Sequence, residues 1–364
     1  MRFDIEDESD KKSKSESSTP PMVLIIAGFL ILAAIILVIT YIALKSGNNT
    51  QRQQPPISTP TTVTTPTPSE PLKIFNENSN ERPIAVMIDN AIGDAKHAGL
   101  LDSYLNYEII VEGGITRIMA IYKDKSPSLI GPIRSSRHYF LDYALESDAI
   151  YVHYGWSPYA ADDVTKLKID NINGLTDPSP FRRDTNSVAP HNVFTTMNYL
   201  KTFLSSSTYN QESLDWQLFT YSAEEVDLSN TNYVPKTADK INIPYSANEY
   251  RTYAYDSSNS YYLRSSNGKA QYDRRSGKQL HYKNIIIQRV PNKTMDNVGR
   301  QQVETVGSGD AYFITDGYFL PIKWSKTSRE GKTTYAYEDG TEITLNDGNT
   351  FIQIVPVDCN VTIE

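Results

Sequence analysis

Three apolar segments of the sequence each end in a polar side chain that is able to take part in acid–base chemistry. Asp89 closes IAVMID, Glu112 follows YEIIV, and His153 follows AIYV. Ligands gather outside the carboxyl ends of parallel strands, so three such strands running in one direction would bring these side chains to one site. In the alternative interpretation, Asp89 caps a turn with Asn90, Glu112 is solvated and His153 packs in a polar corner.

Of the three, Glu112 best fits a general acid. It directly precedes Gly113 and Gly114, which let a ligand or another backbone approach closely. A carboxylic acid held against apolar strands acquires a raised pKa, which suits it to donate a proton. Asp89 would then be the second carboxylate, acting as a base or as an electrostatic stabiliser.

Two arginines frame the start of a predicted helix in the segment IGPIRSSR, residues 130–137. Arg134 and Arg137 flank two serines, where free backbone N–H groups and the helix dipole favour an anion. Two guanidinium groups would add bidentate recognition of a carboxylate or phosphate. The alternative is a buried network in which these arginines pair with Asp142, Asp184 or Glu112.

A loop rich in Pro, Asp and Ser supplies further polar residues in FRRD and APHNVFTT. His191 lies just before a predicted helix cap, where it would act as a general base or orient the loop by hydrogen bonds. Together with His153 and one or two acids it would also offer ligands to zinc. No His-x-x-x-His or His-Glu-x-x-His spacing supports a metal, and no Gly-x-Ser-x-Gly, Walker-type or Gly-x-Gly-x-x-Gly motif is present. The sequence therefore predicts neither a metal nor a cofactor.

Short apolar runs alternate with helical periodicity in the first part of the chain. Strands are predicted at 83–88, 107–111, 117–122 and 149–152, and helices at 135–146, 157–168 and 192–204. Ser157-Pro158 is a helix start signal, and Asn192 is the expected cap of the third helix. This alternation favours an α/β (mixed α+β) domain over residues 72–235.

From about residue 228 the sequence has the pattern of β-hairpins. Short alternating runs are separated by the turn pairs Asn267-Gly268, Asp316-Gly317, Asp339-Gly340 and Asp347-Gly348. We therefore expect a smaller, mainly antiparallel β domain over residues 236–364. The boundary is expected between 225 and 245, unless that stretch is a long loop within one domain.

The amino-terminal part differs from the rest of the chain. Residues 22–44 carry no charge and would form a helix about 34 Å long, enough to cross a bilayer, whereas the apolar core of a cleavable signal peptide is shorter. We predict a cytoplasmic tail at 1–21, a transmembrane helix at 22–45 and a Pro/Thr/Ser-rich linker at 46–71. The domains that follow would then be extracytoplasmic.

The overall composition excludes several classes of protein. A net charge of -8 over 364 residues argues against nucleic-acid binding, which depends on clustered Lys and Arg. The single cysteine, Cys359, excludes an intrachain disulfide and a Cys-based zinc cluster. Tyrosine is abundant, at 25 residues, and suits either half-buried strands or surfaces that stack on sugars.

Several motifs in fixed order resemble the YerB-like family of bacterial envelope proteins: RPIAVMIDN, YEIIVEGGITRIMAIY, IGPIRSSRHYFLDYA, HYGWSP, FRRD, APHNVFTT, and later VGSGDAYFITDG and TFIQIVP. The resemblance implies an N-terminal α/β-type domain, a smaller C-terminal domain and an extracytoplasmic location. It implies no reaction, because the family's domains are classed as of unknown function. Familiar members look like lipoproteins anchored through an N-terminal cysteine, which this chain lacks. The motif positions carried over as site candidates are Asp89, Asn90, Glu112, Gly113, Gly114, Arg117, Arg134, Arg137, His153, Asp184, His191 and Asn192.

Two functional hypotheses follow. In the first, the outer part binds or cleaves a wall polysaccharide such as peptidoglycan. Glu112 would be the acid, with Asp89 and His191 as further catalytic candidates, while Arg134 and Arg137 hold a carboxylate. In the second, the protein is a non-catalytic regulator or scaffold of cell-wall enzymes. The expected partners are the membrane, through residues 22–44, and a wall glycan or envelope proteins, with no nucleic acid.

Overall fold

A computed structural model describes residues 70–91 and 97–364. The predicted tail, the predicted transmembrane helix and nearly all of the predicted linker lie outside the described residues. Within the described ranges, no helix is long and apolar enough to cross a membrane. Residues 68–364 form one compact unit.

Strands are the main regular structure of the described residues, which also contain three α-helices. Ser157 caps the second of these with its side chain and Pro158 is its first residue, as the sequence predicts. Asn192 is not a helix cap, because Val193 and Phe194 form a strand and Thr196 accepts the capping hydrogen bond from Tyr199 N instead. The helices are α2 His138–Leu145, α3 Pro158–Lys166 and α4 Met197–Leu204, with 3-10 turns η1 Glu112–Gly114 and η2 Leu228–Asn230.

An eleven-stranded mixed sheet forms the centre of the molecule, in the order β20-β19-β18-β15-β22-β2-β3-β1-β4-β5, with β9 beside β19. The four strands predicted in the first part are all present, as β1 Ile84–Asp89, β2 Leu105–Ile110, β3 Thr116–Tyr122 and β4 Ile150–His153. The other members are β5 Asn171–Asn173, β9 Lys236–Thr237, β15 Asn284–Val290, β18 Gly307–Thr315, β19 Tyr318–Lys326, β20 Thr334–Ala336 and β22 Thr350–Pro356.

This sheet contains strands from both sides of the predicted boundary at 235/236. β2 pairs in parallel with β22, from Leu105 opposite Thr350 to Ile109 opposite Ile354. The two parts of the chain are therefore joined through backbone hydrogen bonds along most of a strand. The domain limits drawn from the sequence stay a prediction.

A second sheet of six strands is antiparallel, in the order β13-β12-β11-β10-β23, with β14 beside β12. Its strands are β10 Lys240–Ser246, β11 Glu249–Asp256, β12 Tyr261–Ser266, β13 Lys269–Ala270, β14 His281–Tyr282 and β23 Thr362–Ile363. Three two-stranded ribbons complete the structure: β6 Arg182–Arg183 with β7 Val193–Phe194, β16 Asn292–Thr294 with β17 Gln301–Val303, and β8 Thr220–Ser222 with β21 Thr344–Asn346.

Two of the predicted turn pairs join hairpin strands. Asn267-Gly268 connects β12 to β13 and Asp316-Gly317 connects β18 to β19, and all four residues have positive φ, as type I′ turns require. Asp347-Gly348 does not close a hairpin. It links β21 to β22, which belong to different sheets.

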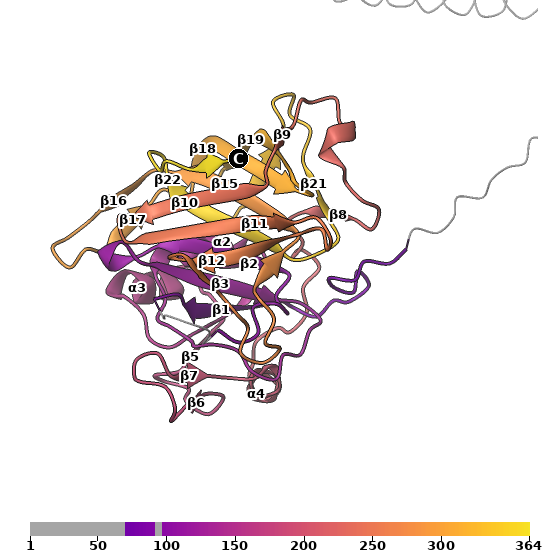
Figure 1. The fold of residues 1–364 in the computed structure, drawn as a ribbon. Coiled ribbons are helices and arrows are strands. Elements are labelled where there is room, and N and C mark those ends of the chain that lie inside the picture. Colours follow the sequence, from indigo (N-terminus) through magenta and orange to yellow (C-terminus); the bar gives the residue numbers. More distant parts are fainter. Residues whose placement is uncertain (1–69, 92–96) are drawn as a thin grey trace, which may run out of the picture. The chain divides into compact units, whose positions relative to one another are not determined.

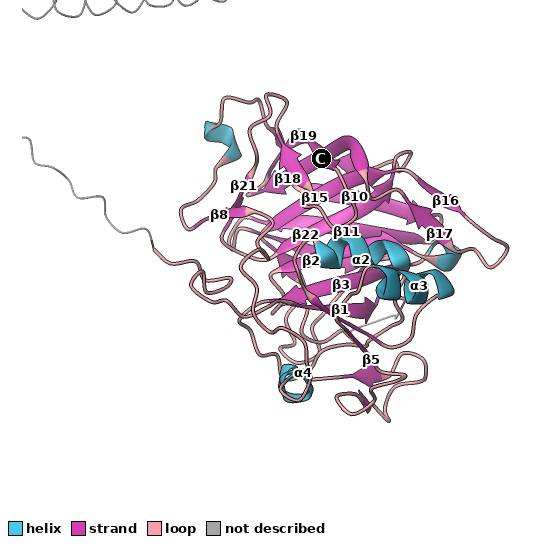
Figure 2. Cartoon of the chain, turned by 180° about the vertical axis from the view of Figure 1, so that it is seen from behind, coloured by secondary structure: helices cyan, strands magenta, loops and turns pink. Residues whose placement is uncertain are grey.

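The large sheet is covered on both faces. Figure 1 shows β10, β11 and β12 in front of it, and Figure 2, from behind, shows α2 and α3 over the opposite face. Alternate residues of β1 divide accordingly, because Met87 joins the core that contains Tyr139 and Tyr143, whereas Val86 joins the core that contains Tyr253. The central strands are therefore buried on both sides.

Candidate functional site

The three strands singled out by their polar ends run in the same direction. β3 pairs antiparallel with both β1 and β2, and β4 pairs in parallel with β1. Asp89, Glu112 and His153 therefore lie toward one edge of the large sheet, although β3 separates β1 from β2. The strand directions that a common site requires are present.

Asp89 is the centre of a polar cluster at this edge. Its carboxylate is buried, and its Oδ2 atom lies 2.5 Å from His191 Nδ1 and 3.1 Å from Arg134 Nε. Its Oδ1 atom accepts a hydrogen bond from the backbone N–H of Ala91. Both partners remain accessible, since 33% of the His191 side chain and 20% of the Arg134 side chain are exposed.

The backbone fixes these partners against the end of β1. Arg134 N donates to Met87 O at 3.0 Å, which aligns the segment that carries Arg134 with β1. Ile133 N donates to Val193 O, so the same segment also holds β7, which begins two residues after His191. The arrangement brings residues 89, 134 and 191 together from three separate parts of the sequence.

Glu112 and Arg137 form a second ion pair at the same edge. Arg137 Nε donates to Oε1 at 2.6 Å and Nη2 donates to Oε2 at 2.7 Å, a bidentate contact. Burial raises the pKa of Glu112, but the hydrogen bonds and charge of Arg137 outweigh burial, so the pKa is lowered from its ordinary value. The expectation of a raised pKa for Glu112 is therefore wrong, and its carboxyl group is ionised at neutral pH.

The glycines after Glu112 have a structural explanation. Gly113 and Gly114 have φ of 71° and 74°, which other residues seldom adopt. A Cβ at Gly114 would lie 3.0 Å from the Cβ of Ser246, so this glycine lets β10 approach.

Arg117 lies between the two ion pairs. It stands opposite Asp89 in the β1–β3 register and donates from Nη1 to Ser135 O at 2.8 Å. Burial, together with the charges of Arg137 and Arg134, lowers its pKa to about 10, so it is still cationic at neutral pH. We call the resulting group the edge cluster, which consists of Asp89, Glu112, Arg117, Arg134, Arg137 and His191.

Other predicted site residues make structural hydrogen bonds. His153 is fully buried, with Nδ1 2.8 Å from Gly155 O and Nε2 3.1 Å from Asn171 Oδ1, and burial lowers its pKa. Asp184 accepts from Arg274 Nη1 at 2.9 Å.

The two predicted asparagines are similarly engaged. Asn192 Oδ1 accepts from Arg183 Nη1 at 2.8 Å, and Asn90 Nδ2 donates to Glu108 and Thr116. Ligand contacts by these residues, and by His153 and Asp184, stay a prediction.

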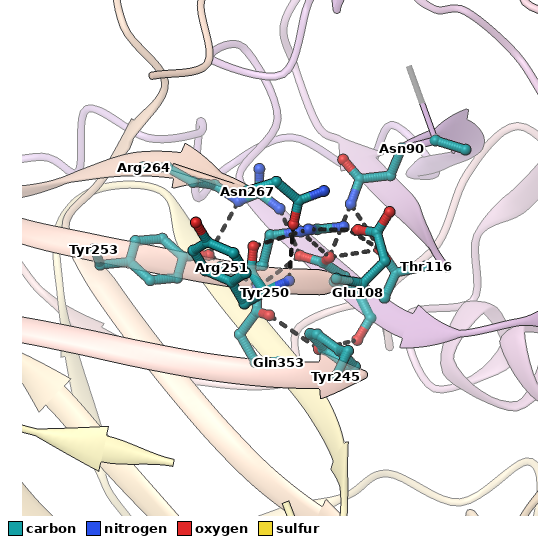
Figure 3. A network of polar contacts seen from close by, with 12 residues as sticks. Asn90, Glu108, Thr116, Tyr245, Tyr250, Arg251, Tyr253, Arg264, Asn267 and Gln353 are labelled. Atoms are coloured by element: carbon teal, nitrogen blue, oxygen red, sulfur yellow. Dashed lines mark hydrogen bonds and ion pairs between the residues drawn. The ribbon is translucent and has the colours of Figure 1, made fainter. Parts of the chain in front are cut away.

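Glu108 is the polar residue that sequence reasoning passed over, and Figure 3 shows its surroundings. The side chain is fully buried and accepts from Arg251 Nε at 2.7 Å and Arg264 Nη2 at 2.6 Å. Burial raises its pKa, but the two arginines and Thr116 outweigh burial and bring the pKa down to about 2. The network joins β2 of the large sheet to β11 and β12 of the second sheet. A lone Glu within the apolar strand LNYEII was the available signal.

The edge cluster presents two groups that are free to bind a ligand. Among the described residues, His191 Nε2 has no hydrogen-bond partner, and the guanidinium of Arg134 has only a weak contact of 3.4 Å to Pro190 O besides Asp89. An imidazole held by a buried carboxylate through Nδ1 is able to accept or donate a proton through Nε2. In the part of the chain that the structure describes, no group of three His, Cys, Asp or Glu side chains is arranged to hold a metal ion.

Comparisons with known proteins agree with this architecture. Two family models match the chain, the protein of unknown function (DUF3048) N-terminal domain over residues 71–210 and the DUF3048 C-terminal domain over 241–352. The protein named "Putative lipoprotein YerB" from Bacillus subtilis (strain 168) is 29% identical over 289 residues, which is 78% of this chain and 84% of that protein. The crystal structure of the YerB protein from Bacillus subtilis matches with a TM-score of 0.69 and 28% identity, covering 81% of this chain and all of that one. The chain therefore belongs to the YerB-like family, which is built from the N-terminal and C-terminal domains of DUF3048.

Proposed function

We propose that this chain is a membrane-anchored, extracytoplasmic envelope protein that binds a cell-wall polysaccharide such as peptidoglycan through the edge cluster. The name of the Bacillus subtilis relative, a lipoprotein, supports the extracytoplasmic location. The uncharged run at 22–44 would serve as a single-pass anchor in place of a lipid-modified cysteine, with the N-terminus in the cytoplasm. The linker at 46–71 would hold the folded part away from the bilayer.

The observation that carries the proposal is the partial exposure of Arg134 and His191 above the buried carboxylate of Asp89. Asp89 holds both side chains in place, so little side-chain freedom is lost when a ligand binds. The guanidinium suits the lactyl and peptide carboxylates of peptidoglycan, and the imidazole suits sugar hydroxyls.

The geometry favours binding over cleavage by Glu112. Both oxygens of that carboxylate accept hydrogen bonds from Arg137, and its lowered pKa leaves no proton to donate at neutral pH. If the protein cleaves its ligand, the Asp89–His191 pair would supply a general base instead.

The non-catalytic regulator or scaffold is the second candidate. It is favoured by the number of polar motif residues that are already paired within the chain, as Glu112 is with Arg137 and Asp184 is with Arg274. In such a protein these pairs would shape an interface.

The test uses the compact unit 68–364 with purified peptidoglycan sacculi. We expect sedimentation with the sacculi, weakened at least about tenfold by Arg134→Ala, which removes a hydrogen bond to a carboxylate worth about 1.5–3 kcal/mol. His191→Ala removes a hydrogen bond to a hydroxyl worth about 0.5–1.5 kcal/mol and should weaken binding by roughly two- to tenfold. Lys323→Ala, which removes one positive charge from an exposed pair on β19, is the control and should bind normally. Soluble products are followed by mass spectrometry alongside Glu112→Gln.

The outcomes separate the candidates. Absence of wild-type sedimentation overturns the proposal and leaves the scaffold. Product release that Glu112→Gln abolishes would contradict our assignment of Glu112 to a structural ion pair.

A further inference from the structure

Two neighbouring cavities, the first of them mainly polar, lie along residues 126–128, and no edge-cluster residue lines either of them. The first, about 560 Å³, is lined by parts of 101–102, 126–129 and 273–281. The second, about 380 Å³, is lined by 126–128 and 196–201. Because Ser126, Pro127 and Ser128 line both, the cavities adjoin, and we call them together the junction groove. Each volume is in the range of small-ligand sites.

The first cavity offers both hydrogen-bond donors and acceptors. Arg275 and Lys278 are exposed and make no side-chain hydrogen bond or ion pair among the described residues, so their donors are available. The carboxylate of Asp102 and the hydroxyls of Ser126 and Ser128 add acceptors. A sugar hydroxyl donates and accepts at once, so this mixture matches a polyhydroxylated ligand.

The loop that carries the two cations is held firmly. Asp273 is buried, and its Oδ1 atom accepts from the backbone N–H groups of Arg275 and Ser276, both at 3.0 Å. Its Oδ2 atom accepts from Gly99 N at 2.7 Å, which ties the loop to the segment before β2. A site that exists before the ligand arrives costs less ordering when the ligand binds.

The charges that line the first cavity balance. Asp102 and Asp273 are matched by Arg275 and Lys278. The lining therefore has no excess of positive charge that would select a polyanion. The buried hydroxyl of Tyr122 has no hydrogen-bond partner among the described residues. Burial and the charges of Asp102 and Asp273 raise its pKa, so an unused polar group lies near the cavity.

The second cavity adds an aromatic ring. Tyr199 lines it and is 38% exposed, and the guanidinium of Arg182 lies 4.6 Å from the ring centre. The guanidinium lies over one face of the ring, so the ring of a sugar would stack on the other face and the polar tip would meet its hydroxyls. Two adjoining cavities, one hydrogen-bonding and one aromatic, fit consecutive units of a chain.

We propose that the junction groove binds an extended, uncharged oligosaccharide, with Arg275, Lys278 and Asp102 contacting hydroxyls of one unit and Tyr199 stacking on the next. This site is separate from the edge cluster. The proposal rests on the proposed function only in taking the oligosaccharide to be part of a wall glycan.

The experiment measures binding of a β-1,4-linked N-acetylglucosamine tetramer to the full-length protein in detergent, by isothermal titration calorimetry. Arg275→Ser/Lys278→Ser and Tyr199→Ala should each weaken binding at least tenfold, while thermal unfolding of each variant confirms that it is folded. Lys323→Ala, on β19 and outside both sites, should bind the tetramer as the wild type does. Inorganic phosphate at equal concentration should not displace the tetramer.

Failure of the wild type to bind, unchanged binding by both groove variants, or displacement by phosphate would overturn the junction-groove site. An equal loss of tetramer binding with Lys323→Ala would show that the groove variants act without specificity, and would also refute the groove. Loss with the groove variants alone supports the groove, whatever the sacculus experiment shows for the edge cluster.

Discussion

Replacing Glu108 by Gln should destabilise the protein more than any other single loss of charge in the candidate region. Five donors converge on its two oxygens at 2.6–3.0 Å, from Thr116, Asn90, Arg251, Arg264 and Gln353. All of this lies between the two sheets, out of contact with water. An amide would leave the buried guanidinium of Arg264 without its carboxylate partner and Arg251 with Glu249 alone.

The expected cost is about 3–5 kcal/mol, the range for breaking a buried ion pair by removing one partner. That is a large share of the roughly 5–15 kcal/mol by which a domain is stable. Glu112→Gln provides the matched control, because it removes a carboxylate that is bidentate to one arginine but partly exposed. It should cost less, about 1–3 kcal/mol, because the pair is bidentate but both side chains still reach water.

The assay is urea unfolding of residues 68–364 at neutral pH, followed by tryptophan fluorescence and circular dichroism, with coincident curves required for a two-state treatment. A third variant, Glu108→Leu/Arg251→Met/Arg264→Met, replaces the charges by apolar side chains and should recover part of the loss. The recovery stays partial because Thr116, Asn90 and Gln353 still lose their acceptor. If Glu108→Gln costs no more than Glu112→Gln, the claim that this network fastens the two sheets together is refuted.

Two further predictions concern pH and helix capping. Burial lowers the pKa of His97 from 6.5 to about 4, so between these pH values the unfolded chain binds a proton at His97 and the folded chain does not. The free energy of unfolding should therefore fall by about 3 kcal/mol as the pH drops from about 6.5 to about 4. A His97→Gln variant should lack that loss in urea titrations across this range. An equal pH dependence in the variant would contradict the assignment. Thr196→Ala should cost about 1 kcal/mol in the same assay because it removes the cap of α4, and an unchanged midpoint would show that this cap contributes nothing.

Most of the strands in the first part of the chain could be predicted because continuous apolar runs indicate buried strands. The segments that became β1 and β3 are buried at every position, and their limits differ from the prediction by one residue at most. The start of α4 was placed too early because periodicity cannot show that Val193 and Phe194 pair with Arg182 and Arg183. Tertiary pairing overrode the local pattern there.

The edge cluster was foreseeable from strand ends, but its internal pairing was not. The partners that keep a carboxylate ionised and fix its position come from distant parts of the chain, as Arg251 and Arg264 do for Glu108. The same limit hid the parallel pairing of β2 with β22, since no local signal at 105–110 points to 350–356. When two segments more than a hundred positions apart pair with each other, neither segment alone carries a sequence pattern that predicts the pairing.

The most direct test of the central claim is a binding isotherm for residues 68–364 on purified peptidoglycan, comparing the wild type with Arg134→Ala/His191→Ala. The account predicts saturable binding by the wild type and at least a tenfold weaker affinity for the double variant, with Lys323→Ala unchanged. Equal affinities for all three proteins, or no saturable binding by the wild type, would contradict it.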